Sequence, residues 1–137
     1  MNENQLKVFT QAEVNQLLPV LSELISGLQK KRDHVVEIEV EIDTLELVSD
    51  HAGEAIPQGL EELITKHHEA IGEFHAIIDQ IHSHGCFLKD VDLGLVDFYG
   101  IVEGCIVYLC WRLGEEQVSF WHEVGQGYAN RKPLITE

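Results

Sequence analysis

Basic residues are scarce in this chain. Its 137 residues include nine lysines and arginines against 24 aspartates and glutamates, which gives a formal net charge of -15. Non-specific nucleic-acid binding needs a cationic face that displaces counterions, and docking on an anionic membrane surface needs basic clusters. The composition therefore excludes both classes, and we expect neither a nucleic-acid partner nor a membrane partner.

Long apolar runs and CxxC cysteine pairs are also missing, and we expect no leader segment. The longest unbroken apolar run, Cys105 to Trp111, is far shorter than the ~20 residues that span a bilayer. Residues 1–5 contain no basic group and no apolar core, so no secretory signal is expected. The three cysteines form no CxxC motif, and an odd number favours reduced thiols. We therefore predict a cytoplasmic protein.

Glycine is unevenly distributed along the chain. Four of the eleven glycines lie in residues 1–84 and seven lie in residues 85–137. This shift indicates a change from helical to turn-rich structure, while the length favours one domain. We predict a single domain over residues 1–137, with a helical hairpin in residues 1–85 and a β-meander with a C-terminal tail in residues 86–137.

The first predicted helix has a clear start and an ambiguous second half. Thr10 and Glu13 have the spacing of a capping box, and apolar residues then recur at three- and four-residue intervals between positions 17 and 28. Within residues 34–43, positions 36–43 alternate Val or Ile with Glu or Asp, a pattern that also fits a strand. We predict one long helix that ends near Asp50, with the strand as the alternative.

A second helix completes the predicted hairpin. Pro19 lies within the first apolar pattern and should kink that helix, because it removes one backbone hydrogen bond. Residues 51–59 contain two glycines and a proline and should form a loop. The apolar residues between 60 and 81 then follow heptad spacing. They predict a helix from about Gln58 to His84, antiparallel to the first, with coiled-coil character.

The last third of the chain favours short strands. Valine, isoleucine, tyrosine and phenylalanine are enriched there between glycines, in four runs: Cys86 to Leu88, Leu95 to Tyr99, Cys105 to Arg112 and Gln117 to Trp121. The gaps Gly100–Gly104 and Leu113–Glu116 suit hairpin turns, and Gly125 to Glu137 should be an irregular tail. The predicted fold class is α+β, a long antiparallel helical hairpin followed by a small antiparallel β-meander.

Histidines on the second predicted helix are one candidate site. His75, Asp79 and His82 lie on one helical face and could offer zinc ligands. Residues seven apart are separated by about 10 Å along a helix, so only neighbouring pairs could share one ion. The alternative is a solvated face beside the apolar row, which we favour. We therefore predict no cofactor and keep histidine-based metal binding as an alternative.

The C-terminal third holds a second candidate site. Histidine beside a carboxylate supports acid–base chemistry, and arginine captures anions. Six side chains could converge on a small ligand-binding cleft: Asp97, Trp111, Arg112, Glu115, His122 and Arg131. The alternative is that these groups hold the sheet and the tail together through buried hydrogen bonds. No recognised catalytic motif is present, which favours a protein that is not an enzyme.

The acidic helices suggest a third kind of function. The carboxylates between Asp33 and Glu54 have no lysine or arginine among them and lack the spacing of a calcium loop. They form either a solvated face or a surface for a basic protein partner. The apolar rows 17–28 and 60–81 exceed what one small sheet can cover, so we also predict a homodimer. The favoured function is an acidic protein-interaction module.

Several short stretches carry a resemblance to a known family. They are Phe9-Thr10, Leu17-Leu18-Pro19, Gly94-Leu-Val-Asp-Phe98, Leu109-Cys-Trp-Arg-Leu-Gly-Glu115, Trp121-His-Glu123 and Gly127-Tyr-Ala-Asn-Arg131. Together they resemble the prokaryotic family catalogued as domain of unknown function 2203, over nearly the whole chain. The resemblance implies a small bacterial or archaeal cytosolic protein with no assigned activity, and it favours helix for residues 33–50. Asn130 stands where the resemblance implies a glycine, which would alter the turn before Arg131.

Overall fold

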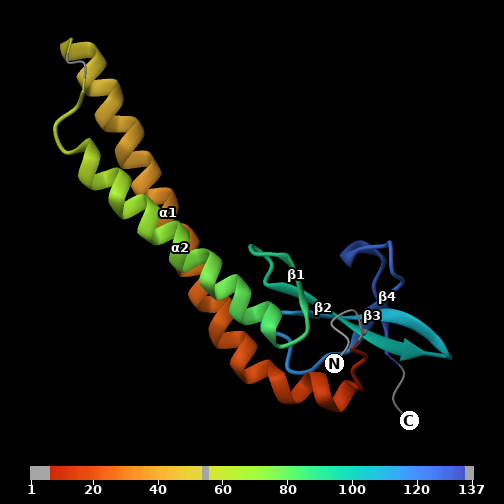
Figure 1. The fold of residues 1–137 in the computed structure, drawn as a ribbon. Helices are drawn as coiled ribbons and strands as arrows, with labels where there is room; N and C mark the ends of the chain where they lie inside the picture. Colours follow the sequence, from red (N-terminus) through yellow and green to blue (C-terminus); the bar gives the residue numbers. More distant parts are fainter. Residues whose placement is uncertain (1–6, 54–55, 135–137) are drawn as a thin grey trace.

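Helices and strands follow one another in two blocks along the chain (Figure 1). The computed structural model describes residues 7–53 and 56–134. The elements are α1 (Gln11–Ala52), α2 (Leu60–Ser83), β1 (Phe87–Asp90), β2 (Leu95–Val102), β3 (Cys105–Arg112), β4 (Phe120–His122), the 3-10 helix η1 (Tyr128–Asn130) and β5 (Lys132–Pro133). This order confirms the predicted α+β class, with a helical hairpin followed by a β-meander.

The first helix begins as its sequence predicts. The Thr10 hydroxyl accepts a hydrogen bond from the Glu13 N–H at 3.1 Å, and the Thr10 N–H donates to the Glu13 carboxylate at 2.9 Å. The second of these bonds, from the backbone of Thr10, is the main reason that the pKa of Glu13 lies below its usual value. The helix continues through Pro19, and its first turns run at an angle to the rest (Figure 1). The predicted kink agrees with this bend.

Residues 34–43 are helical, and the strand alternative is wrong. Val35 and Ile38 are buried against Ala70 of α2, with Ile42 and Ile71 packed beside them. This spacing of three and four presents one apolar side of α1 to α2. The packing of the hairpin therefore decides between the two periods that the sequence allows.

The five strands form one antiparallel sheet in chain order, β1-β2-β3-β4-β5. The strands differ from the prediction in their bounds, since β1 covers Phe87–Asp90 rather than Cys86 to Leu88 and β4 covers Phe120–His122 rather than Gln117 to Trp121. Gly100 belongs to β2 rather than to a turn, and the hairpin turns at Glu103 and Gly104, where φ is 52° and 80°. The tail is not wholly irregular, because β5 pairs with β4. A tail strand of two residues has too little pattern to be found in sequence.

Asn130 does not disturb the tail. Its N–H donates to the Gly127 carbonyl at 2.9 Å, and the Arg131 N–H donates to the Tyr128 carbonyl at 3.2 Å, within and after η1. Among the described non-glycine residues, only Glu103 has a positive φ. This turn therefore does not require the left-handed conformation that favours glycine.

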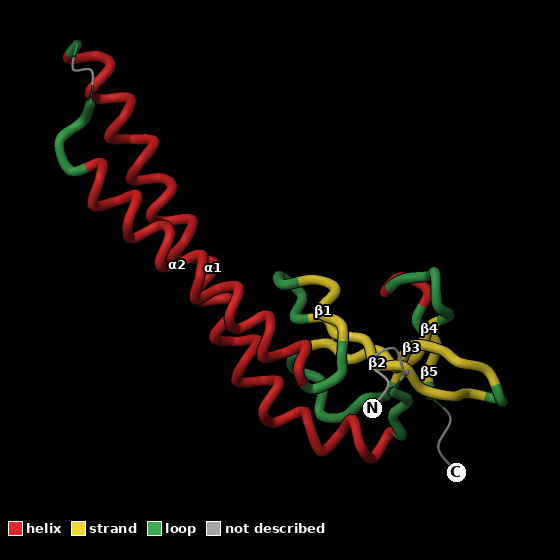
Figure 2. Tube along the Cα trace, viewed as in Figure 1, coloured by secondary structure: helices red, strands yellow, loops and turns green. Residues whose placement is uncertain are grey.

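The core lies between one face of the sheet and one part of the hairpin. Its buried members include Leu21, Ile25 and Leu28 of α1, Ile81 of α2, and Val96, Phe98, Leu109 and Trp111 of the sheet. The apolar row of residues 17–28 is therefore covered largely within the chain. Beyond Arg32 the hairpin projects away from the sheet (Figures 1 and 2). Neither described helix is long and apolar enough to cross a membrane.

Candidate functional site

Three neighbouring strands bring buried polar side chains together on the sheet face opposite the helices. Asp97 of β2 pairs with Cys110 of β3, and His122 of β4 pairs with Tyr108 of β3. Side chains of directly opposed residues share one face of a sheet. Asp97, Cys110 and His122 are 1%, 0% and 1% exposed, and a carboxylate oxygen, the sulfur and a ring nitrogen all lie within 4.8 Å of one another. We call these three residues the polar cluster.

The hydrogen bonds of His122 define where its protons lie. Nδ1 lies 3.0 Å from the Glu123 carbonyl oxygen, and Nε2 lies 3.0 Å from Asp97 Oδ2. A carbonyl only accepts, so Nδ1 carries a hydrogen and donates it. One further proton is then shared between Nε2 and Oδ2. Asp97 Oδ1 is buried and has no hydrogen-bond partner in the described part of the chain.

Cys110 is not an activated nucleophile. Burial raises the pKa of its thiol to about 12, the neighbouring Asp97 acts in the same direction, and Arg131 opposes this only partly. A reactive cysteine needs a lowered pKa and access to solvent. The buried thiol is therefore protonated at neutral pH, and nucleophilic chemistry at this residue is unsupported.

The C-terminal tail is clamped onto the same side of the sheet. Arg131 Nη2 donates to Glu115 Oε2 at 2.6 Å, and Glu115 Oε1 accepts from the Arg112 N–H at 2.7 Å. The Arg131 guanidinium lies 3.9 Å from the ring centroid of Phe120 and 4.7 Å from that of Tyr128. We call Arg112, Glu115, Phe120, Tyr128 and Arg131 the tail clamp.

Five of the six predicted cleft residues are brought together, and one is not. Asp97 and His122 form the buried pair, while Arg112, Glu115 and Arg131 form the clamp. Trp111 lies on the opposite face, in the core, and reaches the group only through its Nε1–H, which donates to the Glu115 carbonyl at 2.9 Å. Neighbouring residues of a strand point to opposite faces, which separates Trp111 from Arg112.

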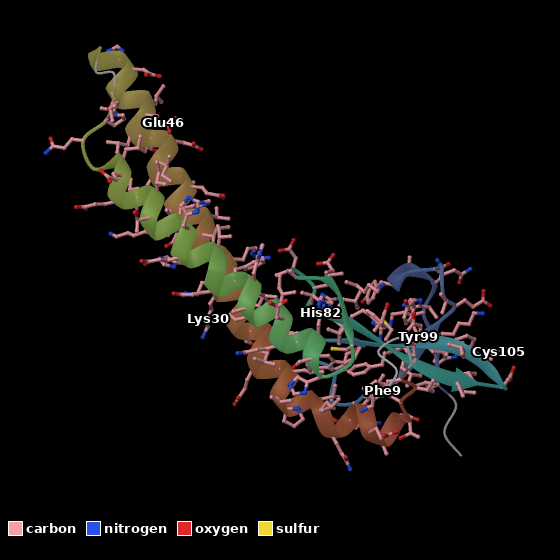
Figure 3. The ribbon with its side chains drawn as sticks, in the orientation of Figure 1. Phe9, Lys30, Glu46, His82, Tyr99 and Cys105 are labelled. Atoms are coloured by element: carbon pink, nitrogen blue, oxygen red, sulfur yellow. The ribbon has the colours of Figure 1, made fainter. Side chains whose placement is uncertain are left out.

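A hollow in the described surface lies elsewhere than the predicted cleft. It has a volume of about 410 Å³ and is lined by residues of the β2–β3 hairpin, by Trp121 of β4 and by the two residues Glu123 and Val124 that follow β4. Figure 3 shows Cys105 at the free end of the β2–β3 hairpin, far from His82 at the end of α2. The hollow does not include Asp97, His122 or Arg131, whose side chains are already engaged with protein groups.

Cys110 and two tyrosines lie at the site but were not among the residues predicted from the sequence. Tyr99 and Tyr108 stack with ring centroids 5.0 Å apart beside the polar cluster, and Lys89 Nζ lies 4.8 Å from the Tyr108 ring. The Tyr108 hydroxyl donates a hydrogen bond to Tyr99, and this bond, followed by burial, raises the pKa of Tyr108 to about 12. The strand period places Cys110 and Arg112 on one face, but only the β2–β3 register pairs Cys110 with Asp97.

The helical metal candidate stays a prediction without further support. His75, Asp79 and His82 are exposed on α2, and His82 Nε2 accepts a hydrogen bond from the Leu88 N–H at 3.4 Å. Within residues 7–53 and 56–134, it is the side chains of the polar cluster whose possible ligand atoms lie close together. No such convergence is found on α2.

These features define the class of the molecule, a small α+β protein whose helical hairpin projects from a five-stranded meander. Residues 7–134 match the model of a family described as "Uncharacterized conserved protein (DUF2203)", and the chain belongs to that family. The match confirms the resemblance that the motifs indicate. No curated protein and no solved structure matches the chain.

Proposed function

We propose that the protein is a protein-interaction module and that the projecting half of its hairpin docks a basic partner segment. We define the hairpin arm as residues 33–53 and 60–71. The last polar contacts of α1 with the β1–β2 connection are those of Gln29, whose Nε2 donates to the Val91 carbonyl at 2.8 Å, and of Arg32 with Asp92. Past them the arm extends away from the sheet, open to a partner (Figure 1).

The observation that carries this proposal is an apolar stripe on the outer side of the arm. Val36, Val40 and Leu47 of α1 are 48%, 57% and 72% exposed. Spacings of four and seven place the three residues within about 40° of one another around the helix. Exposed apolar side chains that share one side of a helix are typical of interaction surfaces.

Charge determines the kind of partner. Residues 33–69 contain eleven carboxylates and one lysine, and Glu46 is one of those on the arm (Figure 3). An apolar stripe within an acidic surface is complementary to an amphipathic helix with lysine or arginine beside its apolar side chains. Such a partner is favoured over a second copy of the chain, whose arm has the same sign of charge.

A defined peptide probe tests the proposal. We expect a fluorescent amphipathic helix of leucine and lysine to bind the full chain, and its glutamate counterpart not to bind. Val40→Gln with Leu47→Gln keeps good helix formers on the arm and should weaken binding at least about tenfold, a change of about 1.4 kcal/mol. The matched control is Ile101→Gln with Ile106→Gln, two exposed apolar residues of the sheet, which should leave affinity unchanged.

The affinity for the lysine peptide should also fall as salt is added, because salt screens the charges of the arm. Equal binding of the glutamate peptide would contradict the proposal. So would unchanged affinity in the arm variant, or an equal loss in the sheet variant.

The alternative function, a small-ligand or enzymatic site around Asp97, His122 and Arg131, has less support. Each of these side chains is buried and paired with another protein group, Asp97 with His122 and Arg131 with Glu115. The three free cysteines support a reducing compartment, and we propose the cytoplasm.

A further inference from the structure

We propose that Asp97, Cys110 and His122 form a zinc site beneath the C-terminal tail. The proposal is independent of the function of the hairpin arm. It rests on three different side chains of metal-ligand type that converge from three adjacent strands. The carboxylate, the thiol and the imidazole are buried together on the sheet face that does not contact the helices. The apolar core lies on the other face, so packing of that core does not explain why these three polar groups are buried.

The geometry fits a tetrahedral ion. Zinc lies about 2.0 to 2.3 Å from nitrogen, oxygen and sulfur ligands, so that ligand atoms around it are about 3.3 to 3.8 Å apart. The three ligand atoms of the polar cluster lie within 4.8 Å of one another. Small rotations of the side chains therefore suffice, and β2 and β3 supply a rigid frame of eight consecutive residue pairs.

The surroundings of the cluster also match a metal site. His122 donates Nδ1–H to the backbone carbonyl of Glu123, the kind of bond that orients a metal-binding imidazole and leaves Nε2 toward the ion. Asp97 Oδ1 is buried with no partner in the described chain, so one carboxylate oxygen is available as an acceptor. Sulfur, nitrogen and oxygen together suit zinc better than magnesium or calcium, which prefer oxygen.

The charge of the cluster balances when zinc binds. Without a metal, Cys110 holds one proton on sulfur, and His122 and Asp97 share one between Nε2 and Oδ2. A zinc ion replaces both, so two protons leave as two positive charges enter, and the net charge of the three groups is unchanged. Three protein ligands leave one position of a tetrahedral ion for a non-protein ligand.

Zinc content of the untagged full chain tests the site. After chelation, zinc addition and removal of the excess, we expect about one tightly bound zinc per chain. Cys110→Ser should lower the bound zinc at least about tenfold. Two controls should retain it: Cys105→Ser, on the opposite face of the same strand, and the α2 double variant His75→Gln with His82→Gln.

Cobalt gives a second readout in case Cys110→Ser fails to fold. A thiolate ligand produces a near-ultraviolet charge-transfer band when cobalt replaces zinc, and the chain has only three cysteines. The band should persist in Cys105→Ser and in Cys86→Ala, which assigns the thiolate to Cys110. The proposal is overturned if the parent chain binds no stoichiometric zinc, if Cys110→Ser keeps it, if the α2 variant loses it, or if the cobalt complex lacks the thiolate band.

Discussion

Arg131 lies in a glycine-flanked tail, yet its side chain is only 8% exposed and is paired with Glu115. Arg131→Ala removes the ion pair and the stacking on Phe120 and leaves the Glu115 carboxylate without its charged partner. We expect a loss of about 2–4 kcal/mol in the free energy of unfolding. At this chain length that corresponds to a fall of about 6–20 °C in Tm, measured by circular dichroism.

Arg131→Lys provides the comparison. It keeps the charge but loses the planar guanidinium that stacks on the rings, so its Tm should fall between those of the parent and Arg131→Ala. A shift of less than about 3 °C for Arg131→Ala would mean that the tail clamp does not stabilise the fold.

His122 provides a second prediction at the residue level, tested in metal-free buffer. His122→Ala leaves the Asp97 carboxylate buried with no partner, and removing one member of a buried pair costs about 3–5 kcal/mol. Urea denaturation measures the change. Ile106→Ala, at an exposed position of β3, should stay within about 0.5 kcal/mol of the parent. Equal effects of the two substitutions would argue against a buried pair.

The raised pKa of the buried Cys86 thiol leads to a prediction of how stability depends on pH. Burial raises the pKa of its thiol from 9.0 to about 12. The unfolded thiol therefore loses its proton at a lower pH than the folded one, so stability is unaffected below about pH 9 and falls as the pH rises from 9 toward 12. The slope from this group is up to about 1.4 kcal/mol per pH unit.

Urea denaturation in reducing buffer at several pH values above 9 tests this prediction. Cys86→Ala removes the thiol, so its unfolding free energy should fall less steeply with pH than that of the parent. Parallel curves for the parent and the variant would show that Cys86 does not contribute to the alkaline loss.

At the scale of elements, the β2–β3 hairpin depends on a glycine within a strand. A Cβ on Gly100 would lie 2.5 Å from Leu109 Cγ, a buried core atom. Gly100→Ala should therefore destabilise the protein by about 1–3 kcal/mol through overpacking. Since the clash is with one side chain, adding Gly100→Ala to a Leu109→Ala variant should cost much less. Strict additivity in the denaturation energies would contradict this cause.

The helix over residues 34–43 illustrates how an element can be ambiguous in sequence. Its apolar residues satisfy a period of two and a helical period at the same time. The structure buries Val35 and Ile38 and leaves Val36 and Val40 exposed. A strand would need partner strands for its backbone groups, whereas α2 offers an apolar side for helix packing. Whether residues 34–43 form a helix or a strand therefore depends on packing against α2, a distant segment that the local pattern does not include.

At the scale of the whole molecule, charge governs association between copies. The apolar row 17–28, on which the predicted homodimer partly rested, is buried within the chain. The stripe of Val36, Val40 and Leu47 remains, surrounded by carboxylates. Two copies should repel at low ionic strength and associate through this stripe as salt screens the charges.

Light scattering at micromolar protein measures this effect. The apparent mass should move from one chain toward two as salt is raised, and Leu47→Gln should suppress the change. A dimer that dissociates on addition of salt, or one that is indifferent to Leu47→Gln, would place self-association on another surface.

Local pattern alone was sufficient for the α+β class, the order of helices before strands, the capping box at Thr10 and the family resemblance. Each of these depends on residues close together in the chain, through capping bonds, apolar period or turn residues. The same patterns also indicated that Asp97, His122 and Arg131 belong to one region. They placed Trp111 in that region wrongly, because the face of each strand depends on its register.

Only the tertiary structure determines which residues form the polar cluster, the tail clamp and the exposed side of the arm. Strand register sets Cys110 opposite Asp97, thirteen positions away in the chain, and the pairing of β5 with β4 holds Arg131 over Phe120. The polar cluster and the tail clamp are buried because the C-terminal tail folds back onto the sheet. Leu47 is exposed because the sheet does not extend as far as the hairpin arm. Contacts between distant segments set these properties, because one chain pattern is compatible with many such pairings until the core selects one.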